Sequence, residues 1–99
     1  MARFDVCRNE VGSGYLLDVQ SDLLSDLNTR VVVPLLPKSE APLPAERLNP
    51  EFEVGEAKVV MATQYMAAVP ESELRFAICN MAEQQIEIST ALDMLFLGF

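Results

Sequence analysis

The side chains that most often carry out catalysis are scarce in this sequence of 99 residues. It contains no histidine, so it offers no imidazole base, no histidine metal ligand and no Ser-His pair. Acidic residues stand two apart at Glu51 and Glu53, and again at Glu71 and Glu73. Such pairs can bind a hard cation or act as a carboxylate dyad, but solvated charges in loops and helix caps explain them better. We therefore expect a protein that is not an enzyme and that uses no metal or cofactor.

Cysteine usage indicates a reducing compartment. Cys7 and Cys79 lie far apart and form no CxxC motif, whereas a secreted domain of this size usually carries about four or more cysteines. The chain opens directly into strand-like residues, without an apolar signal region, and no run approaches the roughly 20 apolar residues of a membrane span. We expect a soluble, cytoplasmic protein in which both cysteines are small core residues.

The formal charge of −8 argues against direct binding to nucleic acid. Such binding normally needs a patch of Lys and Arg that displaces counterions from phosphates. The basic residues are instead scattered, with no two adjacent: Arg3, Arg8, Arg30, Lys38, Arg47, Lys58 and Arg75. A basic or amphipathic protein partner suits this surface better.

Alternating and β-branched segments predict a β-rich fold. Half of the residues are apolar, and a chain this short is expected to form a single domain over residues 1–99. About four to six short strands are expected, among them residues 4–8, 15–20, 31–33, 52–54 and 57–61. Residues 63–68 are expected to continue extended or as a short turn, closed by Val69 and Pro70. Pro34 and Pro37 are expected to end or edge the third of these strands. Residues 37–50 hold four prolines and are expected to form a loop.

The second strand carries two local expectations. Leu17 and Val19 are expected on one face of the strand, with Asp18 and Gln20 on the other. Arg30, beside the valine run, is expected to be a buried ion-pair partner of Asp18 or Asp22, because the three residues are close in the sequence.

The period of the apolar residues changes towards the end of the chain. Residues 82–96 are predicted to form the longest helix, with Ile88, Leu92 and Leu95 at i, i+4 and i+7 on one face. Gly98 is expected to end it. Short strands followed by a helix predict a small barrel with a C-terminal α-helix.

Four segments, in this order, resemble the CcdB family of toxins over nearly the whole chain. Residues 17–24 read LDVQSDLL, similar to the family's VDVQSD followed by two large aliphatic residues. Residues 30–35 read RVVVPL, similar to its R-x-V-I-P-L strand, and residues 61–70 read MATQYMAAVP, similar to its M-x-T-x-x-M-x-S-V-P. Residues 91–99 match in length and pattern and end in an aliphatic residue, glycine and an apolar residue.

The resemblance implies a fold, a target and partners. CcdB-type proteins fold as an SH3-like β-barrel, shared with MazF, with a C-terminal α-helix, and they form homodimers. They are the toxins of type II toxin–antitoxin pairs, which bind the A subunit of DNA gyrase and trap the enzyme on cleaved DNA. A cognate antitoxin neutralises the toxin. Together the two repress their own operon, with the DNA contact supplied by the antitoxin.

The resemblance also implies a gyrase-binding surface. Its members in this sequence would be Ser21, Leu23, Leu24, Asp93, Leu97, Gly98 and Phe99. Independently, residues 95–99 place four large apolar residues at a terminus, where chains usually fray and become polar.

The sequence departs from the family at two of these positions. The best-known members carry Trp in place of Leu97 and Asn in place of Asp93. Trp is a large anchor of the kind that concentrates binding energy, so the change to Leu is expected to lower affinity about tenfold to thousandfold. Asp93 would need a cationic partner. Phe99 is larger than the family's usual Ile and is expected to offset part of the loss.

Two other functions remain open. One is a homologue with weak or no gyrase poisoning that acts mainly as an antitoxin-binding co-repressor, which the departures at Asp93 and Leu97 favour. The other is an endoribonuclease of the MazF type, which the scattered basic residues and the absence of histidine argue against. By family analogy, the antitoxin would contact the loop at residues 8–14 and the loop after Pro37.

Overall fold

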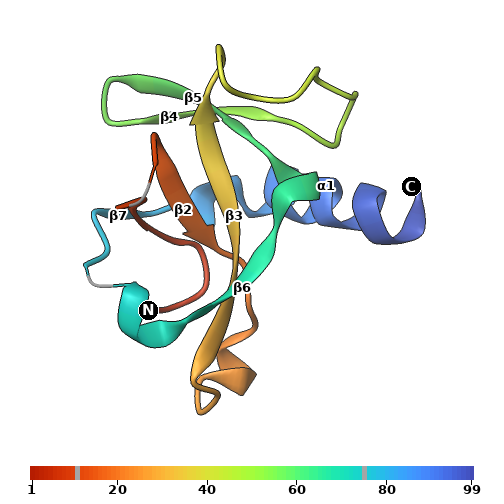
Figure 1. Ribbon diagram of the computed structural model, residues 1–99. Coiled ribbons are helices and arrows are strands. Elements are labelled where there is room, and N and C mark those ends of the chain that lie inside the picture. Colours follow the sequence, from red (N-terminus) through yellow and green to blue (C-terminus); the bar gives the residue numbers. More distant parts are fainter. Residues whose placement is uncertain (11, 75) are drawn as a thin grey trace.

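The computed structural model describes residues 1–10, 12–74 and 76–99, and it shows a curled antiparallel sheet with a helix beside it (Figure 1). Val11, in the loop expected between the first two strands, and Arg75, one of the scattered basic residues, lie outside the described residues. The strands are β1 (Asp5–Arg8), β2 (Tyr15–Asp18), β3 (Thr29–Pro37), β4 (Glu51–Val54), β5 (Ala57–Met61), β6 (Ala67–Pro70) and β7 (Cys79–Asn80). The helical segments are the 3-10 turns η1 (Asp22–Leu24), η2 (Thr63–Tyr65), η3 (Glu71–Glu73) and η4 (Ala82–Gln84), and the α-helix α1 (Gln85–Leu97).

Strand β3 organises the sheet. The strands follow the order β4-β5-β3-β2-β1-β7, and β6 pairs with β3 off this path. The first half of β3 pairs with β6, where Arg30 lies opposite Val69, and the second half pairs with β5, where Leu35 lies opposite Met61. Because β3 changes its partner along its length, the sheet curls around its inner face (Figure 1). This half-barrel with a C-terminal helix confirms the predicted fold class.

The prediction that Pro34 would end or edge the third strand was wrong, because β3 continues through Pro34 to Pro37. Pro34 lies opposite Leu16 in the sheet, and its carbonyl oxygen accepts a hydrogen bond from the N–H of Ala62 at 2.9 Å. Proline lacks an N–H but keeps its carbonyl acceptor, so it can remain within a strand where no N–H is required. Pro37 is the last residue of the strand, as expected.

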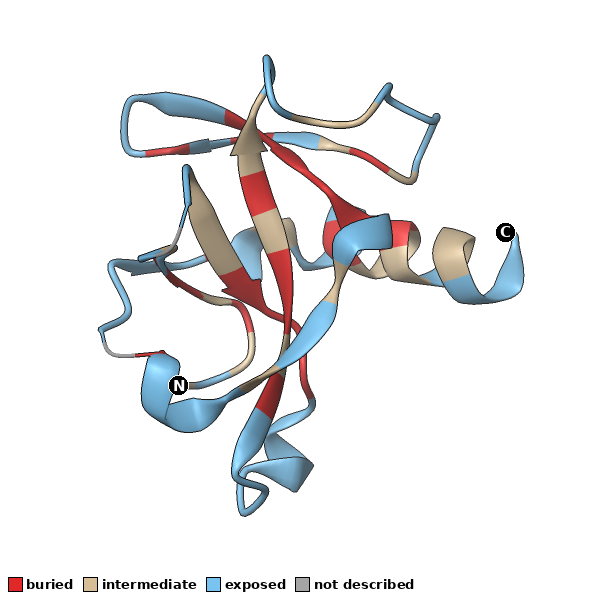
Figure 2. Ribbon diagram, in the orientation of Figure 1, coloured by how far each residue is buried: buried red, intermediate tan, exposed pale blue. Residues whose placement is uncertain are grey.

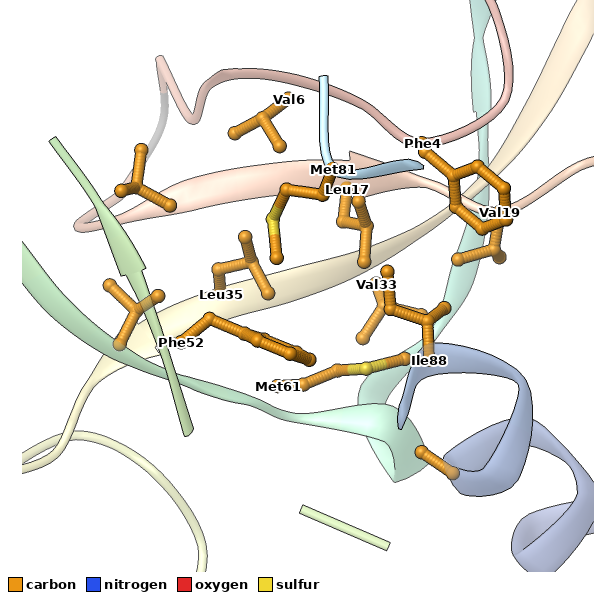
Figure 3. Close-up of a cluster of buried hydrophobic side chains, with 13 residues drawn as sticks. Phe4, Val6, Leu17, Val19, Val33, Leu35, Phe52, Met61, Met81 and Ile88 are labelled. Carbon is orange, nitrogen blue, oxygen red and sulfur yellow. The ribbon is translucent and has the colours of Figure 1, made fainter. Parts of the chain in front are cut away.

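The core fills the concave side of the sheet and is closed by α1. Buried residues gather on the central strands and on the first half of α1 (Figure 2). Side chains from the sheet and the helix interdigitate in one cluster (Figure 3), formed by Phe4, Val6, Leu17, Val19, Val33, Leu35, Phe52, Val54, Val59, Met61, Met81, Ile88 and Ala91. Burial of this apolar surface is the main favourable contribution to folding.

The predicted helix is confirmed with small changes at its ends. Residues 82–84 form the 3-10 turn η4, and α1 follows directly. Ile88 is fully buried, while Leu92 and Leu95 on the same face are half-buried. Gly98 ends the helix with φ of 81°, and its N–H is shared between the carbonyl oxygens of Asp93 and Met94. Among the described residues, no helix is long and apolar enough to cross a membrane.

The two cysteines differ in environment, which corrects one prediction. Cys7 is buried in a second apolar cluster with Val32 and Leu74, as expected. Cys79 is exposed, although it was expected in the core. The reason is its place in β7, a two-residue strand at the edge of the sheet, which among the described residues pairs with β1 alone.

Candidate functional site

The residues expected to bind a target lie in two separate places on the molecule. Ser21, Leu23 and Leu24 belong to the turn around η1, whereas Asp93 to Phe99 form the end of α1 and the residues after it. Figure 1 shows the η1 turn at the lower end of the molecule and the end of α1 at its right-hand side. One copy of the chain therefore does not join the two groups into one patch.

The η1 turn displays its apolar residues to solvent. Leu23 is 95% exposed and Leu24 about half exposed. The Ser21 side chain caps the turn, because its Oγ accepts a hydrogen bond from the N–H of Leu23 at 3.2 Å. The carbonyl oxygen of Ser21 accepts a second bond, from the N–H of Leu24 at 3.0 Å. The turn is thus regular and closed, with Leu23 at its outer surface.

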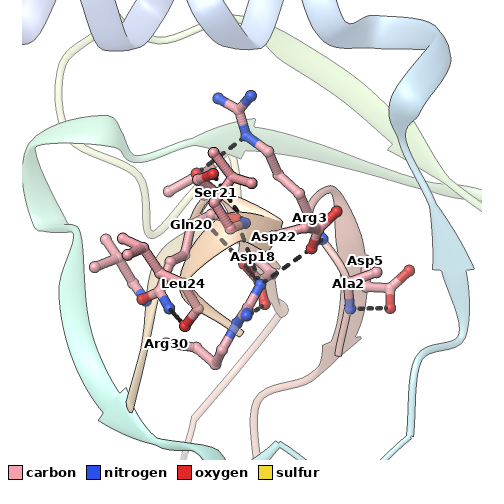
Figure 4. A network of polar contacts seen from close by, with 12 residues as sticks. Ala2, Arg3, Asp5, Asp18, Gln20, Ser21, Asp22, Leu24 and Arg30 are labelled. Atoms are coloured by element: carbon pink, nitrogen blue, oxygen red, sulfur yellow. Dashed lines mark hydrogen bonds and ion pairs between the residues drawn. The ribbon is translucent and has the colours of Figure 1, made fainter. Parts of the chain in front are cut away.

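A buried ion pair lies beneath this turn (Figure 4). Arg30 Nε donates to Asp18 Oδ2 at 2.7 Å and Arg30 Nη2 donates to Asp18 Oδ1 at 3.0 Å, and both side chains are buried. The predicted pairing of Arg30 with Asp18 is therefore confirmed, and Asp22 Oδ1 lies 3.7 Å from Arg30 Nη2 as a second, exposed carboxylate. The hydrogen bond to Asp18 raises the pKa of Arg30, which keeps the guanidinium charged.

Leu17 and Val19 lie in the main core cluster, as their shared face in the sequence indicated, and Asp18 and Gln20 lie outside that cluster but are buried as well. Strand β2 ends at Asp18, and the Gln20 carbonyl oxygen lies close to Arg30. Their polar groups are satisfied within the protein, since the N–H of Gln20 donates to Asp18 Oδ1 at 3.0 Å and Arg30 Nη2 approaches the Gln20 carbonyl oxygen at 3.4 Å. Among the described side chains, no buried nitrogen or oxygen lacks a hydrogen-bond partner.

The end of α1 carries the second group. Leu97 is exposed, Phe99 is 76% exposed, and Asp93 and Gly98 are also at the surface. Phe96, which was not among the predicted site residues, is exposed beside them. The signal for it was already in the sequence, because residues 95–97 are apolar in succession and a helix cannot turn all of them towards one core.

A groove that the sequence did not predict lies beside β1 and β7. Two adjoining cavities of about 210 and 330 Å³ share three charged residues, Arg8, Glu10 and Glu73. Phe76, 80% exposed, lines the smaller cavity. Sequence spacing could not reveal this group, because pairing of β1 with β7 brings together residues more than 60 positions apart. Within the described part of the chain, no three Cys, Asp or Glu side chains converge as a metal site.

Two solved structures share this fold. One is an endoribonuclease in complex with its cognate antitoxin from a mycobacterial species, with a TM-score of 0.76 over 100% of this chain and 98% of that chain. The other is an endoribonuclease from a mycobacterial species, with a TM-score of 0.78 over 100% of this chain and 94% of that chain. Each is 16% identical to this chain, so the likeness is one of fold.

These structures correct the prediction that the protein is not an enzyme, because proteins of the same fold are endoribonucleases. The prediction relied on the absence of histidine and on scattered basic residues. Carboxylates, lysine and tyrosine also serve as general acids and bases, so the absence of histidine does not exclude catalysis. In addition, the fold gathers charged residues that are scattered in the sequence, as Arg8, Glu10 and Glu73 illustrate.

The family of the chain follows from a match to a whole-family model. The model described as "CcdB protein" matches residues 3–98, nearly the entire chain. The match includes the η1 turn, the Asp18–Arg30 pair and α1. The chain therefore belongs to the CcdB family, the toxins of toxin–antitoxin pairs.

Proposed function

We propose that this protein binds the A subunit of DNA gyrase and traps the enzyme on cleaved DNA. The observation that carries the proposal is the outward display of Leu23, 95% exposed on a turn anchored to a buried ion pair. A partner that buries this leucine would gain about 1.5–3 kcal/mol, or roughly 10- to 100-fold in affinity. The resemblance to the family's gyrase-binding residues supports gyrase as that partner.

The end of α1 would form the second contact. Leu97 and Phe99 are exposed, and Phe96 adds an aromatic ring at the same end of the helix. Large aromatic side chains are typical binding anchors, which supports Phe99 as a partial substitute for the Trp that the family carries at the position of Leu97. Asp93 is exposed, so its carboxylate can meet a cationic group of the target without being buried unpaired.

A homodimer and a cognate antitoxin complete the proposal. Dimers with twofold symmetry present each surface twice, and exposed Ile86 supplies apolar area for such a contact. One mycobacterial endoribonuclease of this fold was solved with its cognate antitoxin, which supports an antitoxin partner here. Toxin and antitoxin together would repress their own operon, with the antitoxin contacting DNA. If gyrase binding is weak, this co-repressor role would be the main one.

Calorimetric titration against a fragment of the gyrase A subunit tests the proposal. Leu23→Ala and Phe99→Ala are each expected to lower affinity by about tenfold or more. Leu43→Ala is the matched control, because Leu43 is 94% exposed in the loop after β3 and belongs to neither contact. Absence of binding by a folded wild-type dimer, or equal losses in all three variants, would reject the gyrase contact.

An endoribonuclease is the second candidate, favoured by the groove beside β1 and β7. Arg8 could neutralise a phosphate, the carboxylates of Glu10 and Glu73 could act as acid or base, and exposed Phe76 could stack on a base. Incubation of purified protein with a synthetic RNA, alongside Arg8→Ala and Glu73→Gln, tests it. Cleavage that the variants abolish would support this candidate, whereas intact RNA would reject it.

A further inference from the structure

The side chain of Gln20 joins the η1 turn to the sheet. Its Nε2 donates a hydrogen bond to the carbonyl oxygen of Leu24 at 3.1 Å, and its Oε1 accepts one from the N–H of Val31 at 3.0 Å. Leu24 is the last residue of η1, and Val31 lies in the central strand β3. A single buried carboxamide therefore ties the far end of the turn to the most connected strand (Figure 4).

The first residue of the η1 turn has contacts of its own with the rest of the protein. Asp22, its first residue, accepts a hydrogen bond from the N–H of Arg3 at 2.9 Å and lies 3.7 Å from Arg30. Leu23 stands between these two attachments and is almost fully exposed. Because almost none of the Leu23 side chain is covered by the protein, its position depends on the two ends of the turn.

We propose that Gln20 is a positioning residue for target binding, which holds the η1 turn so that Leu23 and Leu24 are ordered before the partner arrives. This inference rests on the proposed function, since it assigns the turn to the target contact. A surface that is already ordered loses less conformational entropy on binding, so preorganisation raises affinity without adding any contact. Gln20 is buried and would not touch the target itself.

The test compares substitutions of Gln20 and Asn49, two buried carboxamides that each make hydrogen bonds to a loop or turn. Gln20→Met keeps the length of the side chain and removes both hydrogen bonds. The control is Asn49→Leu, because Asn49 is equally buried and bonds to the N–H of Ala45, the Met61 carbonyl oxygen and Gln64, away from the turn. Gln20→Glu is a milder variant that keeps an acceptor for Val31 and loses the donor to Leu24.

Two measurements are made on each variant. NMR order parameters report the backbone of Leu23 and Leu24, and calorimetry reports affinity for the gyrase A fragment. We expect Gln20→Met and Gln20→Glu to lower the order parameters from about 0.85, typical of rigid backbone, to below about 0.6. We also expect them to weaken binding by about tenfold, while Asn49→Leu lowers the melting temperature and changes neither quantity.

The outcomes separate this inference from the proposed function. If both Gln20 variants leave the turn rigid, or loosen it without weakening binding while Leu23→Ala does weaken it, positioning by Gln20 is wrong and the gyrase contact stands. If the wild-type protein does not bind the fragment, both fall together. If Asn49→Leu weakens binding as much as Gln20→Met, the loss reflects general destabilisation and the inference is also rejected.

Discussion

Removing the charge of Asp18 is expected to destabilise the protein severely. Asp18→Asn preserves the shape of the side chain but leaves the buried guanidinium of Arg30 without its close partner, since exposed Asp22 lies 3.7 Å away. Breaking a buried pair by removing one partner costs about 3–5 kcal/mol. Domains of this size have a total free energy of unfolding of about 5–15 kcal/mol. We therefore expect the melting temperature to fall by more than about 10 °C.

Urea unfolding followed by circular dichroism measures this loss. The matched control is Lys38→Ala, which breaks an ion pair between Lys38 Nζ and Glu51 Oε1 at 3.7 Å, with both side chains exposed. Exposed pairs contribute about 0–1 kcal/mol, so the control is expected to be nearly neutral. A loss for Asp18→Asn as small as that for Lys38→Ala would refute the reasoning that the buried pair holds the turn and strand together.

The pH dependence of the stability lost in Asp18→Asn follows from the pKa of Arg30. The hydrogen bond to Asp18 raises the pKa of Arg30 above its ordinary value. A group whose pKa is raised on folding contributes stability that is full below its unfolded pKa and is lost only as the pH rises through the folded value. The stabilisation through Arg30 is therefore constant at neutral and mildly alkaline pH, and the loss in Asp18→Asn is expected to be equal at about pH 7 and about pH 9.

Three further predictions concern the backbone and the thiols. Gly14→Ala is expected to cost at least about 2 kcal/mol in the same urea assay, because Gly14 has φ of 80° and a Cβ would lie 2.1 Å from the carbonyl oxygen of Leu35. Gly55→Ala, with φ of 60° and open space around it, is expected to cost about half as much, and equal losses would contradict this account. Burial raises the pKa of Cys7, and partial desolvation beside the charge of Asp5 raises that of Cys79 although its side chain is exposed, so both are expected to react more slowly than a free thiol with iodoacetamide at about pH 8. Mass spectrometry is expected to find Cys79 modified in the folded protein and Cys7 only after unfolding, and the reverse order would contradict the burial of Cys7. Since the thiol form of Cys7 is favoured on folding, its contribution to stability is full below about pH 9 and falls as the pH rises further, and Cys7→Ala is expected to remove that part of the alkaline loss in melting temperature.

The fold was largely predictable because its signals are local. The apolar period of α1 and the valine run of β3 report burial directly, since each depends only on residues close in the sequence. Local signals also led to one wrong prediction about a strand. Pro34 was expected to end or edge a strand that continues through it, because nothing local reveals that its missing N–H is not needed there.

The members of the candidate site were predicted from the family resemblance, and their part in binding stays a prediction. The structure shows that Leu23 and Leu24 are exposed, whereas the resemblance gave no arrangement of the site. In one copy of the chain the η1 turn and the end of α1 lie apart (Figure 1). This separation depends on the course of the whole sheet, which no short segment of sequence predicts. The groove around Arg8 and Glu73 could not be predicted either, because it forms where segments far apart in the sequence come together.

The sequence by itself determined the family, the order of strands and helix, and the acidic charge, because motifs, periodicity and composition are properties of the chain alone. Only the tertiary structure decided that Asp18 and Gln20 are buried beneath the turn, that Cys79 is exposed, and that distant charges share a groove. Burial and proximity between distant segments depend on which strands pair and where they bend. Those choices are made by the packing of the whole core rather than by any residue and its neighbours.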